Sequence, residues 1–166
     1  SRNGTFNSGA VMPIIFARVD DRLIHGQVVQ AWLPELNVDE ILIPCLKGKE
    51  SCLNRGLLRL SLPYEYELTI LDSHSCARYA ENSKRRIFLL MSSLAELTDL
   101  IKDGLQLKSV NIGGMHFKEG AQKLDDNVFL NETDKRFLKL ISDLGINIET
   151  RAVPTSATLS MREVLP

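Results

Sequence analysis

The sequence has few cysteines, and they form no recognisable pattern. Cys45, Cys52 and Cys76 are an odd number without a Cys-x-x-Cys spacing, and the chain shows neither a signal peptide nor a long apolar span. These absences argue against a disulfide scaffold, a secreted domain and a membrane-spanning protein. We therefore expect a cytoplasmic protein in a reducing compartment, with no insertion of its own into a bilayer.

Basic charge is not concentrated anywhere along the chain. The 20 Lys and Arg residues face 21 Asp and Glu residues, which gives a formal net charge of −1 at pH 7. Residues 84–86, Lys-Arg-Arg, are the one cationic cluster, and their place before an apolar run is typical of a solvated turn. The sequence therefore lacks an electrostatic signature for binding nucleic acid or an anionic membrane.

Motifs of several common site classes are also missing. The first apolar run is not followed by Gly-x-Gly-x-x-Gly or by Gly-Lys-Ser/Thr, which argues against a dinucleotide site and a P-loop. A Ser-His-Asp hydrolase would need a Gly-x-Ser-x-Gly elbow, and a zinc site would need paired His and Cys ligand spacings; neither is present. We therefore predict no metal and no cofactor.

The length and the apolar content fit one domain. A chain of 166 residues with 44% hydrophobic residues is long enough for one well-buried core and too short for two. Residues 1–11 are polar and lack periodicity, and Met12 resembles a natural start. We expect residues 1–11 to be a leader outside the fold and residues 12–166 to form the domain.

Apolar runs alternate with amphipathic segments along the domain. We expect strands at residues 14–19, 40–44, 65–71, 86–91, 109–112, 127–130 and 146–150. The first is apolar enough for the centre of a sheet, and the alternation in the last suits an edge strand. Helices are expected at about 26–36 and after the cap candidates Ser51, Asp72, Ser93 and Asn131. This order predicts an α/β fold: an open, mainly parallel, twisted sheet of about six to seven strands with helices on both faces.

Residues 18–29 form the candidate site, between the first strand and the first helix, where open α/β sheets bind ligands. A neutral imidazole at His25 has a ring nitrogen that can attack phosphorus and carry the group covalently. Arg18 and Arg22 offer planar donors that fit phosphate oxygens. Asp20 and Asp21 can hold these guanidinium groups or fix the tautomer of the histidine. The stretch therefore has the chemistry of a phosphohistidine site.

Further residues complete the predicted phosphate site. Gly26 leaves the approach to the first helical amides open, and Gln27 belongs to the same turn, where a helix start favours anions. Ser92, after the fourth strand, is a second candidate because neighbouring parallel strands end at one edge. Gly113 and Gly114 permit a tight turn, a close approach of the backbone, or a phosphate cradle.

The same residues resemble a known family. Arg-x-Asp-Asp-Arg-Leu-Ile-His-Gly-Gln-Val at 18–28 is similar to the phosphorylation-site motif of the IIB components in the sorbose/mannose/fructose class of bacterial sugar phosphotransferase systems. Residues 110–115 resemble that family's Val-Asn-x-Gly-Gly-Met segment, and residues 145–154 are similar as well. The resemblance covers residues 12–166 in order and spacing. One departure is the cationic loop at 44–49, where many relatives have an acidic or Asn-Asp-containing loop.

This resemblance implies a phosphocarrier with an antiparallel edge strand in its sheet. His25 would accept a phosphoryl group from a phospho-IIA domain and pass it to a hexose-type sugar that enters through membrane IIC and IID subunits. A function of another class stays open. In a regulatory module of the same fold, phosphorylation of His25 would signal to a protein partner.

Overall fold

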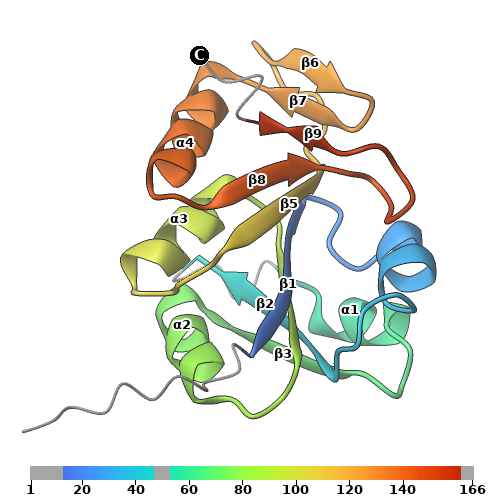
Figure 1. Ribbon diagram of the computed structural model, residues 1–166. Helices are drawn as coiled ribbons and strands as arrows, with labels where there is room; N and C mark the ends of the chain where they lie inside the picture. The colour runs from blue at the N-terminus through green and yellow to red at the C-terminus, as the bar shows by residue number, and fades with distance from the viewer. Residues whose placement is uncertain (1–12, 47–52, 162–166) are drawn as a thin grey trace, which may run out of the picture.

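A central sheet organises the computed structural model, which describes residues 13–46 and 53–161 (Figure 1). In the described residues, its strands are β1 (Ile14–Asp20), β2 (Glu40–Cys45), β3 (Glu67–Asp72), β4 (Ile87–Met91), β5 (Ser109–Gly114), β8 (Asn147–Thr150) and β9 (Leu159–Ser160). Their order is β3-β2-β4-β1-β5-β8-β9. All described neighbours pair in parallel except β8 and β9. The predicted parallel sheet and its antiparallel edge strand are therefore confirmed.

Helices cover both faces of this sheet. On one face lie α2 (Ser73–Asn82), α3 (Leu94–Lys102) and α4 (Glu132–Asp143), and on the other lie η1 (Gln27–Trp32) and α1 (Arg55–Ser61) (Figure 1). Two apolar cores result, because successive strand side chains point to opposite faces. In β4, for example, Leu89 packs in the first core, while Phe88 and Leu90 pack in the second. None of the described helices is long and apolar enough to cross a bilayer.

A short hairpin lies beside the central sheet. Strands β6 (Gln122–Asp125) and β7 (Val128–Leu130) pair antiparallel, and a bridge between Met115 and Val128 joins the hairpin to the end of β5. The strand predicted at 127–130 therefore exists, as part of this hairpin. The edge position predicted for 146–150 is wrong, because β8 lies between β5 and β9. Strand β9 has only two residues, too few for a period-2 pattern to reveal.

Most helix starts follow the predicted caps. The side chains of Asp72 and Ser93 accept hydrogen bonds from the amides of Ser75 and Glu96 at the starts of α2 and α3. Asn131 caps α4 in a reciprocal capping box with Asp134. For α1 the cap in the structure is Asn54, and the predicted cap, Ser51, lies outside the described residues.

The first helix differs from the prediction in type and length. Residues 27–32 form a π-helix, in which the Leu33 amide donates to the Val28 carbonyl five residues earlier at 2.9 Å. The pattern predicted a helix over 26–36. Pro34 lacks an amide hydrogen and limits how far a helix can continue. Single turns of π-helix occur frequently at functional sites.

Candidate functional site

Two charged side chains are completely buried at the carboxyl end of β1. Arg18 and Asp20 have 0% exposure and are joined by an ion pair of 2.9 Å. Arg18 also donates to Asn111 Oδ1 on β5 at 2.6 Å and to the carbonyl oxygens of Arg151 and Ala152 at 2.9 and 3.1 Å. These bonds fix the guanidinium between β1, β5 and the chain that follows β8.

Gly113 and Gly114 make room for this pair. A Cβ atom on Gly113 would lie 1.8 Å from Cζ of Arg18, and one on Gly114 would lie 2.7 Å from Oδ1 of Asp20. Both glycines continue β5, and neither has a positive φ, so the predicted tight turn is wrong. The close backbone approach, also predicted, is confirmed, and side chains of β1 are what approach.

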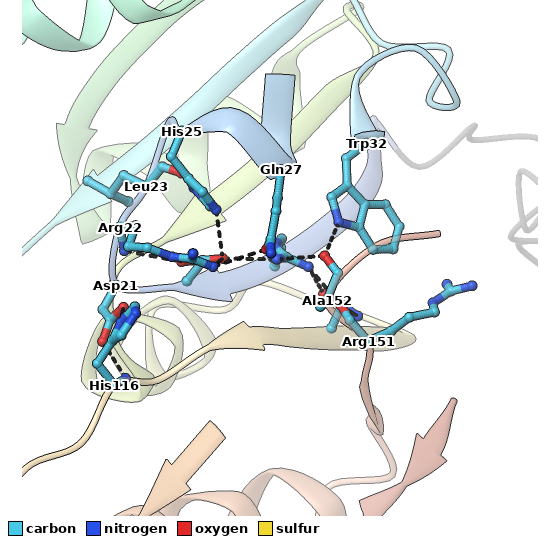
Figure 2. A network of polar contacts seen from close by, with 12 residues as sticks. Asp21, Arg22, Leu23, His25, Gln27, Trp32, His116, Arg151 and Ala152 are labelled. Atoms are coloured by element: carbon cyan, nitrogen blue, oxygen red, sulfur yellow. Dashed lines mark hydrogen bonds and ion pairs between the residues drawn. The ribbon is translucent and has the colours of Figure 1, made fainter. Parts of the chain in front are cut away.

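Asp20 connects this buried pair to the exposed part of the site. Its carboxylate accepts hydrogen bonds from the Arg22 amide at 3.1 Å and from Nε and Nη2 of Arg22 at 3.2 and 3.3 Å. Arg22 Nη2 also donates to Gln27 Oε1 at 3.0 Å. Figure 2 shows this chain of contacts running beneath His25. Arg22 has 31% of its side chain exposed, so it offers a guanidinium to solvent where Arg18 does not.

The ring of His25 lies between two oxygen atoms (Figure 2). Nδ1 is 2.7 Å from the Leu23 carbonyl oxygen, and Nε2 is 3.7 Å from Oδ2 of Asp20. Leu23 has a φ of 54°, a conformation that costs a non-glycine residue about 1–3 kcal/mol and that recurs at functional sites. Nε2 is buried and has no hydrogen-bond partner among the described residues. Nε2 is therefore not exposed to a ligand in this arrangement.

The opposite charges of Asp20 and the two arginines favour each other's ionised forms. Burial would raise the pKa of Asp20, but the hydrogen bond from Arg22 and the charge of Arg18 hold it below its ordinary value. Burial lowers the pKa of Arg18, and Asp20 partly offsets that effect. Asp20 is therefore a carboxylate near neutral pH, with Arg18, Arg22 and His25 around it.

Trp32 closes the network from the side of η1. Its ring stacks on Phe16 with centroids 4.5 Å apart, and the guanidinium carbons of Arg18 and Arg151 lie 5.3 and 5.1 Å from its centroid. Its Nε1 donates to the Ala152 carbonyl oxygen at 2.9 Å, the same oxygen that accepts from Arg18. Core packing, the predicted role of Trp32, is confirmed, and the ring also fixes the chain that holds Arg18.

Sequence reasoning missed three members of this network: Asn111, Arg151 and Ala152. They lie 93 to 134 residues from Arg18 along the chain, and two of them contribute carbonyl oxygens, which any residue has. The available signal was indirect. Both segments that resemble the family outside the histidine motif, 110–115 and 145–154, contain these partners.

Two predicted residues lie apart from the His25 network. Asp21 accepts hydrogen bonds from the His116 amide at 2.8 Å and from Nδ1 of the His116 ring. Ser92 donates its hydroxyl and its amide to the Glu96 carboxylate, both at 2.7 Å. Burial raises the pKa of Glu96, and the bonds from Ser92 oppose that rise. Asp21, Ser92 and His116 line a cavity of ≈ 400 Å³ on the α3 and α4 side of the loop.

Gly26 has free space around it. A Cβ atom there would meet no atom within 4 Å, and the backbone is right-handed helical with φ −51° and ψ −46°. Nothing inside the described protein therefore requires a glycine at this position. The described residues also contain no cluster of three or more His, Cys, Asp or Glu side chains that could hold a metal ion.

Comparison with known proteins adds independent evidence. Residues 14–166 match the family model of the PTS system sorbose subfamily IIB component. The chain is 35% identical over 147 residues to the sorbose-specific EIIB component of Lacticaseibacillus casei, covering 87% of this chain and 90% of that one. It is 32% identical over 157 residues to the mannose-specific EIIAB component of Escherichia coli K12, covering 93% of this chain. The chain spans only 49% of that relative's length.

A solved structure has the same fold. The IIBSor domain of the sorbose permease from Klebsiella pneumoniae superposes with a TM-score of 0.82 at 26% identity, covering 90% of this chain and 94% of that one. The parallel sheet and the match over residues 14–166 therefore point to the same family. The chain belongs to the sorbose-subfamily IIB components of the sugar phosphotransferase system, a family of sugar phosphotransferase and transport proteins.

Proposed function

We propose that this chain is a phosphocarrier that accepts a phosphoryl group on His25 from a phospho-IIA domain. It then transfers the group to a hexose-type sugar during uptake through the membrane IIC and IID subunits. The observation that carries this proposal is the contact of Asp20 with both Arg22 and His25 at the carboxyl end of β1. Asp20 holds the partly exposed guanidinium of Arg22 beside His25, whose ring is bound at Nδ1 by the Leu23 carbonyl oxygen. A positioned cation beside the acceptor nitrogen is what stabilises a transferred phosphoryl group.

Arg22 is the principal phosphate-binding side chain in this proposal. Its guanidinium is bound to Asp20 and Gln27 and is partly exposed, so it can donate to the oxygens of a group on His25. The amides of Gly26 and Gln27, at the start of η1, supply further donors. Ser92 is proposed as a secondary contact, which would require it to leave Glu96.

Arg18 and Asp20 have a positioning role. Arg18 is buried and its two terminal nitrogens are bound to protein oxygens, so the phosphate contact predicted from the sequence would require the network to break. We assign it instead to holding Asp20 in place. Asp20 in turn orients Arg22 and places a negative charge 3.7 Å from Nε2 of His25, while Asp21 orients the neighbouring loop through His116.

The partners and the location follow from the family. The name of the Escherichia coli relative joins a IIA and a IIB part in one chain, which supports a IIA domain as the donor. A carrier that meets a IIA domain and the inner side of membrane subunits would be cytoplasmic, with peripheral association at the membrane.

Phosphorylation of the purified chain by a phosphorylated IIA donor tests this proposal. We expect one acid-labile phosphate on His25 in the wild-type chain and none in His25→Ala. His74→Ala is a matched control, since His74 is also a histidine beside a carboxylate, at 3.4 Å from Asp103, but lies on α2. Labelling of His25→Ala at the wild-type level would contradict the assignment.

A further inference from the structure

The side chain of Gln27, two residues after His25, binds the arginine that is proposed to hold phosphate. Nη2 of Arg22 donates to Oε1 of Gln27 at 3.0 Å and to Oδ2 of Asp20 at 3.3 Å. Because a guanidinium only donates, the Gln27 amide must present its oxygen, and not its NH₂ group, to this nitrogen. The contact therefore fixes the orientation of the amide as well as that of the arginine.

The hydrogen bonds of the Arg22 guanidinium leave one of its nitrogens free. Nε and Nη2 are bound to Asp20 and Gln27, whereas Nη1 has no hydrogen-bond partner among the described residues. A guanidinium is planar, so holding two of its nitrogens fixes the direction of the third. Nη1 is therefore the donor that Arg22 can offer to a ligand without breaking its present contacts.

The same contacts place this guanidinium next to the histidine. Oδ2 of Asp20 is 3.3 Å from Nη2 of Arg22 and 3.7 Å from Nε2 of His25, so one carboxylate oxygen is a neighbour of both groups. Figure 2 shows the Gln27 side chain extending from the start of η1 to this chain of contacts, beside the His25 ring. A phosphoryl group on the ring would therefore lie close to Arg22.

Gln27 differs from Asp20 in carrying no charge. The Asp20 carboxylate already accepts two hydrogen bonds from the Arg22 side chain. A second carboxylate at position 27 would bind the same guanidinium and would also repel the negative charge of a phosphoryl group. A neutral amide supplies an acceptor oxygen without that repulsion, so the positive charge of Arg22 stays available to phosphate.

We propose that Gln27 is a positioning residue, whose amide oxygen turns the Arg22 guanidinium so that Nη1 faces a phosphoryl group on His25. This inference rests on the proposed function. During charging, the bond between phosphorus and the donor nitrogen breaks as a bond to a His25 nitrogen forms, and negative charge is spread over the three equatorial oxygens. A donor that is already oriented stabilises this charge without reorganisation.

Gln27→Met tests the orientation, because it removes the amide oxygen and keeps a long side chain that suits a helix. Charging by a phosphorylated IIA domain should slow by roughly 10-fold, as for the loss of one hydrogen bond to a charged group. The same change in Arg22→Lys should slow charging by less than about twofold, since an ammonium group has no planar fork to orient. Gln30→Met is the matched control, at an exposed glutamine of η1, and should be charged at the wild-type rate.

Gln27→Glu separates orientation from charge. It keeps an oxygen that can accept from Nη2 of Arg22 but adds a negative charge beside the phosphoryl group. The charging equilibrium, measured as the ratio of phosphorylated chain to phosphorylated donor, should shift toward the donor by roughly 10-fold at low salt and by less at about 1 M salt. Gln30→Glu adds the same charge without a contact to Arg22 and should cause a smaller shift.

Equal charging rates of the wild type and Gln27→Met would overturn the inference while leaving His25 as the carrier. An undiminished effect of Gln27→Met in Arg22→Lys would also overturn it, because the glutamine would then act independently of the arginine. An equilibrium in Gln27→Glu equal to that of the wild type at low salt would contradict the need for a neutral acceptor. Failure of the wild type to become charged would instead contradict the proposed function.

Discussion

Arg18 and Arg22 both bind the Asp20 carboxylate, but solvent reaches only Arg22. Arg18 is in contact with four oxygen-bearing partners inside the protein, so its contribution is to the folded state. Arg22 keeps part of its guanidinium exposed next to His25, so its contribution is to a bound phosphate. Replacing Arg18 should therefore lower the stability of the fold, whereas replacing Arg22 should lower the rate of phosphoryl transfer.

Replacing Arg18 should reduce stability. Arg18→Met leaves the Asp20 carboxylate buried with one partner fewer and removes the donors from the Arg151 and Ala152 carbonyl oxygens. Removing one member of a buried ion pair typically costs about 3–5 kcal/mol. We expect a loss of that order in the free energy of unfolding, measured by urea denaturation.

Arg22→Lys is the matched variant. It keeps a cation at a partly exposed position but loses the planar fork, so its free energy of unfolding should change by less than about 1 kcal/mol. Its rate of charging by a phosphorylated IIA donor should fall by roughly 10²-fold, as for the loss of a preorganised donor. Near-normal charging in Arg22→Lys, or normal stability in Arg18→Met, would contradict the division of roles.

At the scale of elements, β5 packs against the side chains of β1 through its glycines. Gly113→Ala places a Cβ atom 1.8 Å from Cζ of Arg18, whose buried guanidinium is held by four hydrogen bonds. We expect a loss of stability of about 1–3 kcal/mol or more, as for other overpacked cores. Thermal unfolding followed by circular dichroism measures it.

Gly26→Ala is the control at the other glycine of the site. It fills open space on a right-handed helical backbone, so its stability should be unchanged or rise by about 0.4–1 kcal/mol. If Gly26 keeps the approach to the helix amides clear for phosphate, the same variant should be charged more slowly. A large loss of stability in Gly26→Ala, or none in Gly113→Ala, would contradict this account of the two positions.

The elements that sequence patterns predicted have a regular apolar pattern over enough residues to be recognised. Strands β1, β2 and β4 have helices on both faces, so their residues are almost continuously apolar and easy to recognise. Short elements such as β6 and β9 have no such pattern. The π-helix η1 was not recognised because Val28, Val29 and Trp32 also fit α-helical spacing.

In the site, too, local contacts could be predicted from the sequence and long-range contacts could not. Asp20, Arg22 and His25 lie close together in the sequence, and their contacts follow from one turn. The burial of Arg18 depends on Asn111 and on two backbone carbonyl groups more than 90 residues away, which a single sequence does not reveal. The glycines at 113 and 114 were noticed, but the side chains that require them could be identified only from the packing of β5 on β1.

At the scale of the whole molecule, the buried carboxylates give stability a defined pH dependence. The pKa of Asp20 is lower in the folded chain than its ordinary value, so the unfolded chain binds this proton more readily. Its contribution is complete above the ordinary value of ~3.9 and is lost as pH falls through the lower folded value. Glu96 acts in the opposite sense, because its raised pKa makes stability decrease as pH rises above its ordinary value.

Urea denaturation between about pH 2 and 6 measures this dependence. In acid, the free energy of unfolding of the wild type should fall as Asp20 becomes protonated. Asp20→Asn should be less stable at pH 6, because its pairs with Arg18 and Arg22 are weakened, and should show a shallower acid limb. Parallel curves for the two proteins would mean that Asp20 does not contribute to the acid limb.

A carrier and a signalling module of this fold would both be phosphorylated on His25, and they differ in what happens next. A carrier needs well-positioned but brief contacts with its donor and acceptor, because the group must leave quickly. A signalling module needs a lasting modified state and a partner that binds one form more tightly than the other.

The most direct test is the fate of the phosphate on His25 after the donor is removed. The ³²P-labelled chain is mixed with membrane vesicles containing the IIC and IID subunits, first without sugar and then with sorbose, mannose or fructose. We predict that the label stays on the protein without sugar and leaves it rapidly with the cognate sugar, appearing as sugar phosphate in equal amount. A label that persists on His25 with every sugar, while the modified chain binds a soluble protein tightly, would contradict the carrier function.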